Sequence, residues 1–293
     1  MSTKNGPGIV TTPTRFIQAG NERYAYRRFG SGSKLPLLCL QHFTGTLDNW
    51  DPAVTDPLAI DREVILFENA GLGRSSGSVP TTIAGMSMHA QAFLDALQLK
   101  TCDVLGFSLG GMVAQQMALE RPSSFRRIIL VGTAPRGGED IMHLDKPRIA
   151  KHLGDPTLKG YAVLQKIFFA PTSSSQSAGA EFIQRLMQRS EDREPVSGPA
   201  VAQAQIAAFR EWEQASGERF AELKKIDHPT LVINGVFDDM IPVSNSYWLS
   251  AHLPNAVLMT YPDSGHGSLF QFHESFTRQA IAFLASESAY APY

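Results

Sequence analysis

Eight short segments of the sequence are rich in apolar, β-branched or aromatic residues. They are residues 15–19, 23–29, 35–40, 63–67, 102–107, 127–131, 231–234 and 257–261. Several of them, such as 35–40 and 102–107, are apolar without alternation, which is typical of strands buried on both faces of a parallel sheet. Helical patterns at 86–97, 109–119, 244–252 and 274–285 follow individual segments. This alternation requires crossover connections, so the sequence predicts an α/β fold with a mostly parallel central sheet of about eight strands flanked by helices.

The pattern changes between residues 136 and 228. This stretch contains helical patterns at 158–169, 180–188, 201–214 and 218–225 and no convincing strand, and the polar segments 171–177 and 194–199 are predicted to be surface loops. We therefore expect residues 1–135 and 229–293 to form one core and residues 136–228 to form a helical cap inserted into it.

The composition limits the partners of such a chain. Hydrophobic residues make up 43% and charged residues 18%, which indicates a packed core rather than a disordered chain. The chain has 26 Lys and Arg against 28 Asp and Glu, so we expect no nucleic-acid partner. No apolar run reaches about 18 residues and the N-terminus has no apolar stretch typical of a signal peptide, so we expect a cytoplasmic protein that does not bind membranes. The sequence does not constrain the oligomeric state.

The remaining motifs indicate neither a metal nor a cofactor. Cys39 and Cys102 lie in apolar runs, so we expect buried free thiols rather than a disulfide. The sequence contains no H-E-x-x-H pattern and no P-loop, and we predict no bound metal or cofactor. The expected partner is a small-molecule substrate.

The pattern G-x-S-x-G occurs twice, at residues 73–77 and 106–110. A nucleophilic serine of this type needs a strand before it and a helix after it, because it occupies a sharp turn between the two. Ser108 has both neighbours, an apolar strand pattern and the helical pattern that starts at residue 109. Ser75 lies in a loop and is soon followed by Gly77 and Pro80. We therefore predict Ser108 as the nucleophile and a tight structural loop around Ser75.

A serine hydroxyl needs a base to accept its proton, and the base needs an acid to orient it. Among the eight histidines, His266 lies in a Gly-flanked loop directly after the strand pattern 257–261. That position is at the carboxyl edge of the predicted sheet, where sites of open parallel sheets gather. Asp238 and Asp239 both follow the strand pattern 231–234 and are both candidates for the acid.

Four motifs together resemble the α/β-hydrolase superfamily over nearly the whole chain: GFSLGG at 106–111, ENAGLGRSSG at 68–77, GVFDDMIP at 235–242 and PDSGHG at 262–267. The resemblance is strongest to its capped, cofactor-free esterase, lactonase and non-haem haloperoxidase branch. In that family the acid stands in G-x-x-D-x-x-x-P, which selects Asp238. The triad order Ser108, Asp238, His266 is also the order of the family.

The resemblance further implies an oxyanion hole made by the N–H groups of Leu109 and Phe43. The family usually has His-Gly before the second donor, whereas this chain has Gln41 and His42. The side chain of His42 is expected either to line the substrate site, where it would contact substrate, or to have a structural role behind it.

The predicted activity is that of a serine hydrolase that cleaves a carboxylic ester or lactone through an acyl-enzyme. Apolar cap residues, of which Phe168 and Phe169 are the leading candidates, are expected to line a pocket for a small-to-medium hydrophobic substrate. Alternatives that use the same fold are a cofactor-free perhydrolase or haloperoxidase-type activity, a ligand receptor, and cofactor-free dioxygenase or carbon–carbon bond cleavage.

Overall fold

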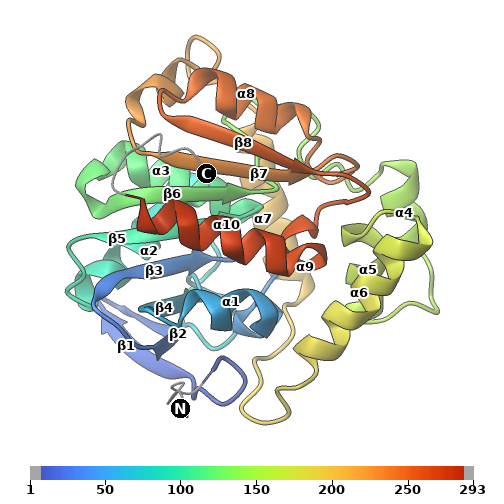
Figure 1. Cartoon of the computed structure of the whole chain (residues 1–293), viewed down its shortest axis with the longest axis horizontal. Helices are drawn as coiled ribbons and strands as arrows, with labels where there is room; N and C mark the ends of the chain where they lie inside the picture. The colour runs from blue at the N-terminus through green and yellow to red at the C-terminus, as the bar shows by residue number, and fades with distance from the viewer. Residues whose placement is uncertain (1–7, 287–293) are drawn as a thin grey trace.

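The computed structural model describes residues 8–286, which fold around one eight-stranded sheet (Figure 1). The order across the sheet is β1-β2-β4-β3-β5-β6-β7-β8. β1 pairs antiparallel with β2 and β2 with β4, and the other five pairings are parallel. The strands are β1 (Arg15–Ala19), β2 (Glu22–Gly30), β3 (Lys34–Leu40), β4 (Arg62–Phe67), β5 (Cys102–Phe107), β6 (Phe125–Val131), β7 (Thr230–Gly235) and β8 (Ala256–Tyr261). The predicted mostly parallel sheet is confirmed.

Helices cover both faces of the sheet, which explains the uninterrupted apolar character of its central strands. All residues of β5 and β7 are buried. In Figure 1, α1 and α10 lie side by side in front of the sheet, and α2 and α3 lie together behind it. α8 packs against β7 and β8. These helices are α1 (Pro52–Leu58), α2 (Ile83–Ala96), α3 (Leu109–Glu120), α8 (Ser244–His252) and α10 (His273–Ala285), and the short α9 (Ser268–Gln271) precedes α10.

The segment between β6 and β7 contains helices and, in agreement with the sequence, no strand between residues 136 and 228. Its elements are α4 (Pro147–Leu153), α5 (Tyr161–Phe168), α6 (Ser173–Leu186), α7 (Pro199–Trp212) and the 3-10 helix η3 (Ala221–Lys225). α4, α5 and α6 stand beside the sheet at the right of Figure 1, whereas α7 packs against α2. The division into a core and a cap at residues 135 and 229 stays a prediction.

Two of the expected loops need correction. Within residues 171–177, helix α6 already begins at Ser173, because the hydroxyl of Thr172 accepts a hydrogen bond from the N–H of Ser175 and caps the helix. Within residues 194–199 the backbone is irregular as expected, but Glu194 is buried rather than on the surface. The reason is a set of ionic partners far away in the sequence, which is described below.

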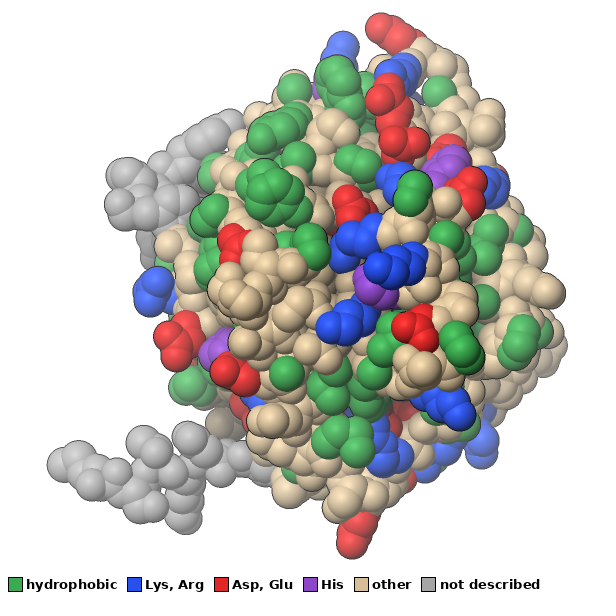
Figure 2. Space-filling view, turned by 90° about the vertical axis from the view of Figure 1, so that its right-hand side faces the viewer, with side chains coloured by type: hydrophobic (Ala, Val, Ile, Leu, Met, Phe, Trp, Pro, Cys, Tyr) green, Lys and Arg blue, Asp and Glu red, His purple; other side chains and the backbone are tan. Residues whose placement is uncertain are grey.

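The face that carries α4–α6 shows acidic, basic and apolar side chains intermixed (Figure 2). A small basic group on α4 and α5 consists of Arg148, Lys151 and Lys166, and these charges, after burial, lower the pKa of His152. Within residues 8–286, no helix has the length and apolar character needed to cross a membrane. Cys39 and Cys102 are buried and free, as predicted.

Candidate active site

Ser108 occupies the turn between β5 and α3, in a backbone conformation that side chains seldom adopt. Its φ is 56° and its ψ is −119°. The turn leaves no space at the flanking glycines: a Cβ at Gly106 would lie 2.5 Å from the carbonyl oxygen of Gly110, and a Cβ at Gly110 would lie 2.1 Å from that of Leu40. The N–H of Ser108 donates to the carbonyl of Val131 at 2.8 Å, which ties the turn to the next strand. The surrounding structure therefore imposes a strained backbone on this serine, as is common at functional sites.

Ser75, the serine of the other G-x-S-x-G copy, has a structural role. Its hydroxyl donates to the carbonyl of Glu68 at 2.8 Å and accepts from the N–H of Ala25 at 2.9 Å. Both contacts hold the loop after β4 against β2, so this hydroxyl is not free to react.

His266 and Asp238 come from the loops after β8 and β7 and meet at the carboxyl edge of the sheet. Nδ1 of His266 lies 2.7 Å from Oδ2 of Asp238, and both side chains are buried. The other oxygen of Asp238 accepts from the N–H groups of Met240 and Ile241 at 2.9 Å each. These bonds fix the carboxylate, which in turn orients the imidazole so that Nε2 is the nitrogen available to a substrate or nucleophile.

The carboxylate of Asp239, the alternative acid, has a different partner from that of Asp238. Its carboxylate pairs with the guanidinium of Arg148 on α4 and is partly exposed. Arg148 also donates to the carbonyls of Lys166 and Phe169 at 2.7 and 3.2 Å. Asp239 therefore binds the segment that ends α5 and does not contact the imidazole.

Ser108 and His266 line the same cavity, although they are not yet hydrogen-bonded to each other. Oγ of Ser108 and Nε2 of His266 are both buried, and neither has a hydrogen-bond partner within residues 8–286. Hydrogen bonds between a nucleophile and its base are often long before substrate binds. The three predicted residues thus come together at the carboxyl edge of the sheet: Asp238 binds His266, and His266 and Ser108 line one cavity.

Two backbone N–H groups remain available beside the serine, those of Leu109 and Phe43. Leu109 is the first residue of α3, so its N–H has no partner inside the helix. The N–H of Phe43 donates no hydrogen bond within the part of the chain that the structure describes. They are the two groups that the resemblance assigns to an oxyanion hole, and such donors act by binding charge that develops in the transition state.

The loop after β3 has Gln41 and His42 where the family usually has His-Gly, and its backbone conformation does not require a glycine at position 42. Oε1 of Gln41 accepts from the N–H of His42 at 2.9 Å, and the left-handed backbone of the turn falls on Thr44 with φ of 57°. The N–H of Thr44 donates to the side chain of Gln205 on α7 at 2.6 Å. Helix α7 thus holds the loop that carries Phe43. The sequence analysis did not predict a role for Gln205. The feature that could have indicated it is a polar residue on the same face of α7 as the buried residues Ala208, Phe209 and Trp212.

The ring of His42 is part of the cavity wall. Its centroid lies 5.4 Å from that of Phe107 and 5.1 Å from that of Phe168, and its Nδ1–H donates to the carbonyl of Phe43 at 2.8 Å. Burial, together with the nearby His266, lowers the pKa of His42 to about 3. The ring is therefore neutral near pH 7, with Nε2 as an acceptor that is unpartnered within residues 8–286.

Phe168 covers the reacting groups, and Phe169 does not. The ring of Phe168 stands edge-on to His266 at 5.2 Å between centroids, and its carbonyl accepts from the N–H of Gly267 at 2.8 Å. Phe169 packs against Phe182 on α6 and is absent from the cavity wall. The structure thus does not place Phe169 in the cavity wall, where it was expected, because successive residues at the end of α5 face different directions.

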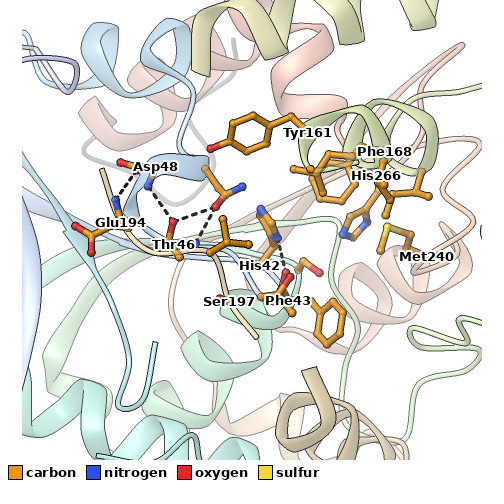
Figure 3. Close-up of a pocket in the computed structure, with 18 of the residues that line it drawn as sticks. His42, Phe43, Thr46, Asp48, Tyr161, Phe168, Glu194, Ser197, Met240 and His266 are labelled. Atoms are coloured by element: carbon orange, nitrogen blue, oxygen red, sulfur yellow. Dashed lines mark hydrogen bonds between the residues drawn. The ribbon is translucent and has the colours of Figure 1, made fainter. Parts of the chain in front are cut away.

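The cavity has a volume of about 340 Å³ and two chemically different ends (Figure 3). We call the region around Ser108 the catalytic end, and Figure 3 shows His266, Phe168 and Met240 gathered there. We call the opposite region the polar end; it is lined by Thr46, Asp48, Asn49, Tyr161, Arg193, Glu194 and Ser197. Aliphatic residues of α5, namely Val163, Leu164 and Ile167, contribute to the wall as well.

A buried arginine–carboxylate cluster, Arg27, Asp48, Arg74 and Glu194, supports the polar end. Arg27 lies 2.7 Å from Asp48, and Arg74 binds both oxygens of Glu194 at 2.7 and 3.0 Å. The N–H of Glu194 donates to Asp48 at 2.7 Å. The cluster therefore fastens the segment after α6 to strand β2 and to the loops after β3 and β4.

Glu68 lies next to this cluster and is a buried carboxyl without a cationic hydrogen-bond partner of its own. It accepts from the N–H groups of Leu47 and Arg74 at 3.0 and 3.1 Å. Burial, and then the neighbouring carboxylate of Glu194, raise the pKa of Glu68 to about 8. Glu68 therefore carries a proton over much of the neutral pH range.

No group of three or more His, Cys, Asp and Glu side chains within residues 8–286 is placed to hold a metal ion. The chemistry that the cavity offers is that of its side chains and backbone N–H groups: a buried hydroxyl, an imidazole oriented by a carboxylate, and two unpaired donors.

Comparison with known proteins agrees with this fold. Residues 36–272 match the sequence profile of the family described as alpha/beta hydrolase fold, and the chain belongs to that family. An alpha/beta hydrolase fold protein from Chitinophaga pinensis is 40% identical, with a TM-score of 0.89 over 96% of this chain and 100% of the other. A hydrolase from Pseudomonas aeruginosa PA01 is 26% identical, with a TM-score of 0.72 over 93% of this chain and 98% of the other.

In sequence, the chain is also similar to a protein provisionally named carbamate hydrolase RutD from Caulobacter sp. (strain K31). The two are 28% identical over 231 residues, which cover 77% of this chain and 82% of the relative. Of the three proteins named here, the Caulobacter protein is the one whose name specifies the bond that it cleaves.

Proposed function

We propose that this protein is a serine hydrolase that cleaves a carboxylic ester or lactone of a small-to-medium hydrophobic substrate. The observation that carries the proposal is the strained Ser108 opening onto the same cavity as the Asp238–His266 pair. A volume of about 340 Å³ with a largely apolar wall suits a ligand of this size.

In the proposed reaction, Oγ of Ser108 attacks the acyl carbon while its proton moves to Nε2 of His266. Asp238 stabilises the imidazolium, and the N–H groups of Leu109 and Phe43 bind the oxyanion. The C–O bond of the ester then breaks, and His266 returns the proton to the leaving alcohol. Water attacks the acyl-enzyme by the same route in reverse and releases the acid.

The carbamate hydrolase named among the relatives supports a second candidate bond. A carbamate presents the same electrophilic carbonyl with a nitrogen on the other side, so the same groups can act on it. The two candidates share the nucleophile and differ in the group that leaves.

The test is hydrolysis of short p-nitrophenyl esters, aliphatic lactones and ethyl carbamate by the wild type and by Ser108→Ala. Loss of the nucleophile is expected to lower kcat on the preferred substrate by roughly 10⁴-fold or more. Ser75→Ala is the matched control from the other G-x-S-x-G copy; it removes two structural hydrogen bonds and is expected to lower the Tm rather than the rate at 20 °C.

Equal rates for Ser108→Ala and wild type would overturn the assignment. Absence of turnover, together with no labelling of Ser108 by a fluorophosphonate, would support a ligand receptor on the hydrolase fold.

A further inference from the structure

The polar end of the cavity presents hydrogen-bond donors that the protein itself does not use. Asn49 is 9% exposed and lies in the first turn after β3, where Thr46 and Asn49 form a capping box. Oδ1 of Asn49 accepts from the N–H of Thr46 at 2.9 Å and from its hydroxyl at 3.2 Å. These bonds fix the amide, and its NH₂ group donates no hydrogen bond within residues 8–286. Because Asn49 lines the cavity, this donor is available to a ligand or to water.

Tyr161, at the start of α5, supplies a second donor. Its hydroxyl oxygen accepts from the guanidinium of Arg193 at 2.6 Å, so the proton of the hydroxyl remains free. Burial raises the pKa of Tyr161, which keeps the hydroxyl protonated. In Figure 3 the hydroxyl points toward the end where Asp48 and Glu194 lie, and away from His266.

The two carboxylates at this end are already engaged. Asp48 binds Arg27 and the N–H of Glu194, and the carboxylate of Glu194 is held by Arg74. Arg193, the remaining cation of the wall, donates to the carbonyl of Arg189 at 2.8 Å as well as to Tyr161. An anionic ligand would bring a further negative charge beside two buried carboxylates. An uncharged acceptor meets the two donors without that cost.

We propose that the polar end is a second recognition site for the substrate, where the amide NH₂ of Asn49 and the hydroxyl of Tyr161 bind an uncharged carbonyl or ether oxygen. This proposal rests on the proposed function, because the same ligand places its scissile carbonyl at Ser108. Aliphatic side chains of α5, including Val163, Leu164 and Ile167, contact the part of the substrate between the two groups. The substrate class is therefore an ester or lactone with a second, neutral oxygen function beyond a short apolar segment.

The proposal is tested with substrates that differ only in that oxygen. One series is p-nitrophenyl heptanoate and its 4-, 5- and 6-oxo derivatives; a second carries the ketone on the alcohol side of hexanoate esters. At least one ketone is expected to raise kcat/KM over its parent ester by roughly threefold to tenfold, mainly through KM, as one or two neutral hydrogen bonds do. The half-ester of heptanedioic acid, which ends in a carboxylate, is expected to be a poorer substrate than the heptanoate.

Two variants assign the preference to the two donors. Asn49→Asp keeps the oxygen that caps the turn and replaces the NH₂ donor, and Tyr161→Phe removes the hydroxyl alone. Each is expected to lower the ratio of kcat/KM between the preferred ketone ester and its parent by roughly threefold to tenfold. Tyr247→Phe, at an exposed position on α8, is the matched control and is expected to leave that ratio unchanged.

Several results would overturn the proposal: no preference for any ketone in the wild type, a ratio that neither variant changes, or a preference for the carboxylate. Binding of ethyl 6-oxoheptanoate and ethyl heptanoate to Ser108→Ala, followed by ligand-detected NMR, tests recognition without turnover. If no substrate is hydrolysed but Ser108→Ala binds the ketone more tightly in an Asn49- and Tyr161-dependent manner, the proposed reaction fails and the recognition site stands. If hydrolysis depends on Ser108 but shows no ketone preference, the proposed reaction stands and the proposed recognition site fails.

Discussion

The catalytic end of the cavity is built from histidines and aromatic rings, with Asp238 as the carboxylate behind them, whereas the polar end rests on a cluster of guanidinium and carboxylate groups. At the catalytic end, the chain leaves Oγ of Ser108 and Nε2 of His266 without partners, so these atoms are free to react. At the polar end, Asp48 and Glu194 are each held by an arginine and by backbone contacts. The first region retains unsatisfied groups for chemistry. The second uses its charges to hold distant segments together. Mutations in the two regions should therefore affect different quantities.

The largest expected effect is on rate, at the catalytic end. Asp238→Asn preserves the shape of the side chain but presents an NH₂ group to His266, which favours the wrong imidazole tautomer. We expect kcat on the best ester to fall by roughly 10⁴-fold. The measurement is steady-state kinetics at pH 7.5, with Asp239→Asn as the neighbouring control, for which less than about a threefold change is expected because Asp239 pairs with Arg148 near the surface. A larger loss in Asp239→Asn than in Asp238→Asn would show that the acid has been misassigned.

The next effect is on stability, at the polar end. Arg27→Met removes the cation closest to the buried carboxylate of Asp48, whereas Glu194 keeps its pair with Arg74. The free energy of unfolding is expected to fall by about 3–5 kcal/mol. Urea unfolding followed by circular dichroism measures it. The control is Arg28→Met, on the same strand as Arg27, which breaks a partly exposed pair with Glu63 on β4. It is expected to lower the free energy of unfolding by less than about 1 kcal/mol. Similar losses in both variants would mean that the cluster is no more important to the fold than a surface ion pair.

The smallest expected effect is a pH dependence of the free energy of unfolding, which arises from Glu68 beside the polar end. Because the pKa of Glu68 is raised from 4.5 to about 8, the folded protein retains a proton that the unfolded chain has already lost at neutral pH. This contribution to stability is complete below about pH 4.5 and is lost as the pH rises through about 8. Glu68→Gln should remove a decline of about 2 kcal/mol between pH 6 and 8, measured by urea unfolding at several pH values. A decline that is equally steep in the variant would assign it to other groups.

The parts of the fold and site that could be predicted are those encoded by neighbouring residues. The turn at Ser108 is set by the strand before it, the helix after it and glycines at 106 and 110, all within a few positions. His266 and Asp238 could be located because parallel strands bring the loops that follow them to one edge. The choice between Asp238 and Asp239 needed the family pattern, since both stand in the same loop and only the fold shows which one faces the imidazole.

The parts that could not be predicted depend on contacts between distant segments. Gln205 reaches Thr44 across 161 positions and Glu194 reaches Asp48 across 146, and no local pattern relates either pair. Glu194 was expected on the surface because its segment is polar and rich in turn-forming residues. Burial of that carboxylate follows from Arg27 and Arg74, whose positions are known once β2 and the loop after β4 are in place. Phe168 and Phe169 were equivalent in sequence, and the end of helix α5 decides which ring enters the cavity.

The ring of Phe168 over the catalytic end has a kinetic consequence. Oγ of Ser108 is buried in this conformation and the ring of Phe168 packs edge-on against His266, so we expect a bulky acylating or phosphonylating reagent to react only when the ring and the end of α5 move aside. The observed rate of inactivation by such a reagent should therefore level off at high concentration, at the opening rate of the protein itself. A reagent small enough to pass the ring should keep a linear dependence. If the rate levels off in this way, the opening of the protein sets the upper limit on how quickly any large molecule can react with the serine.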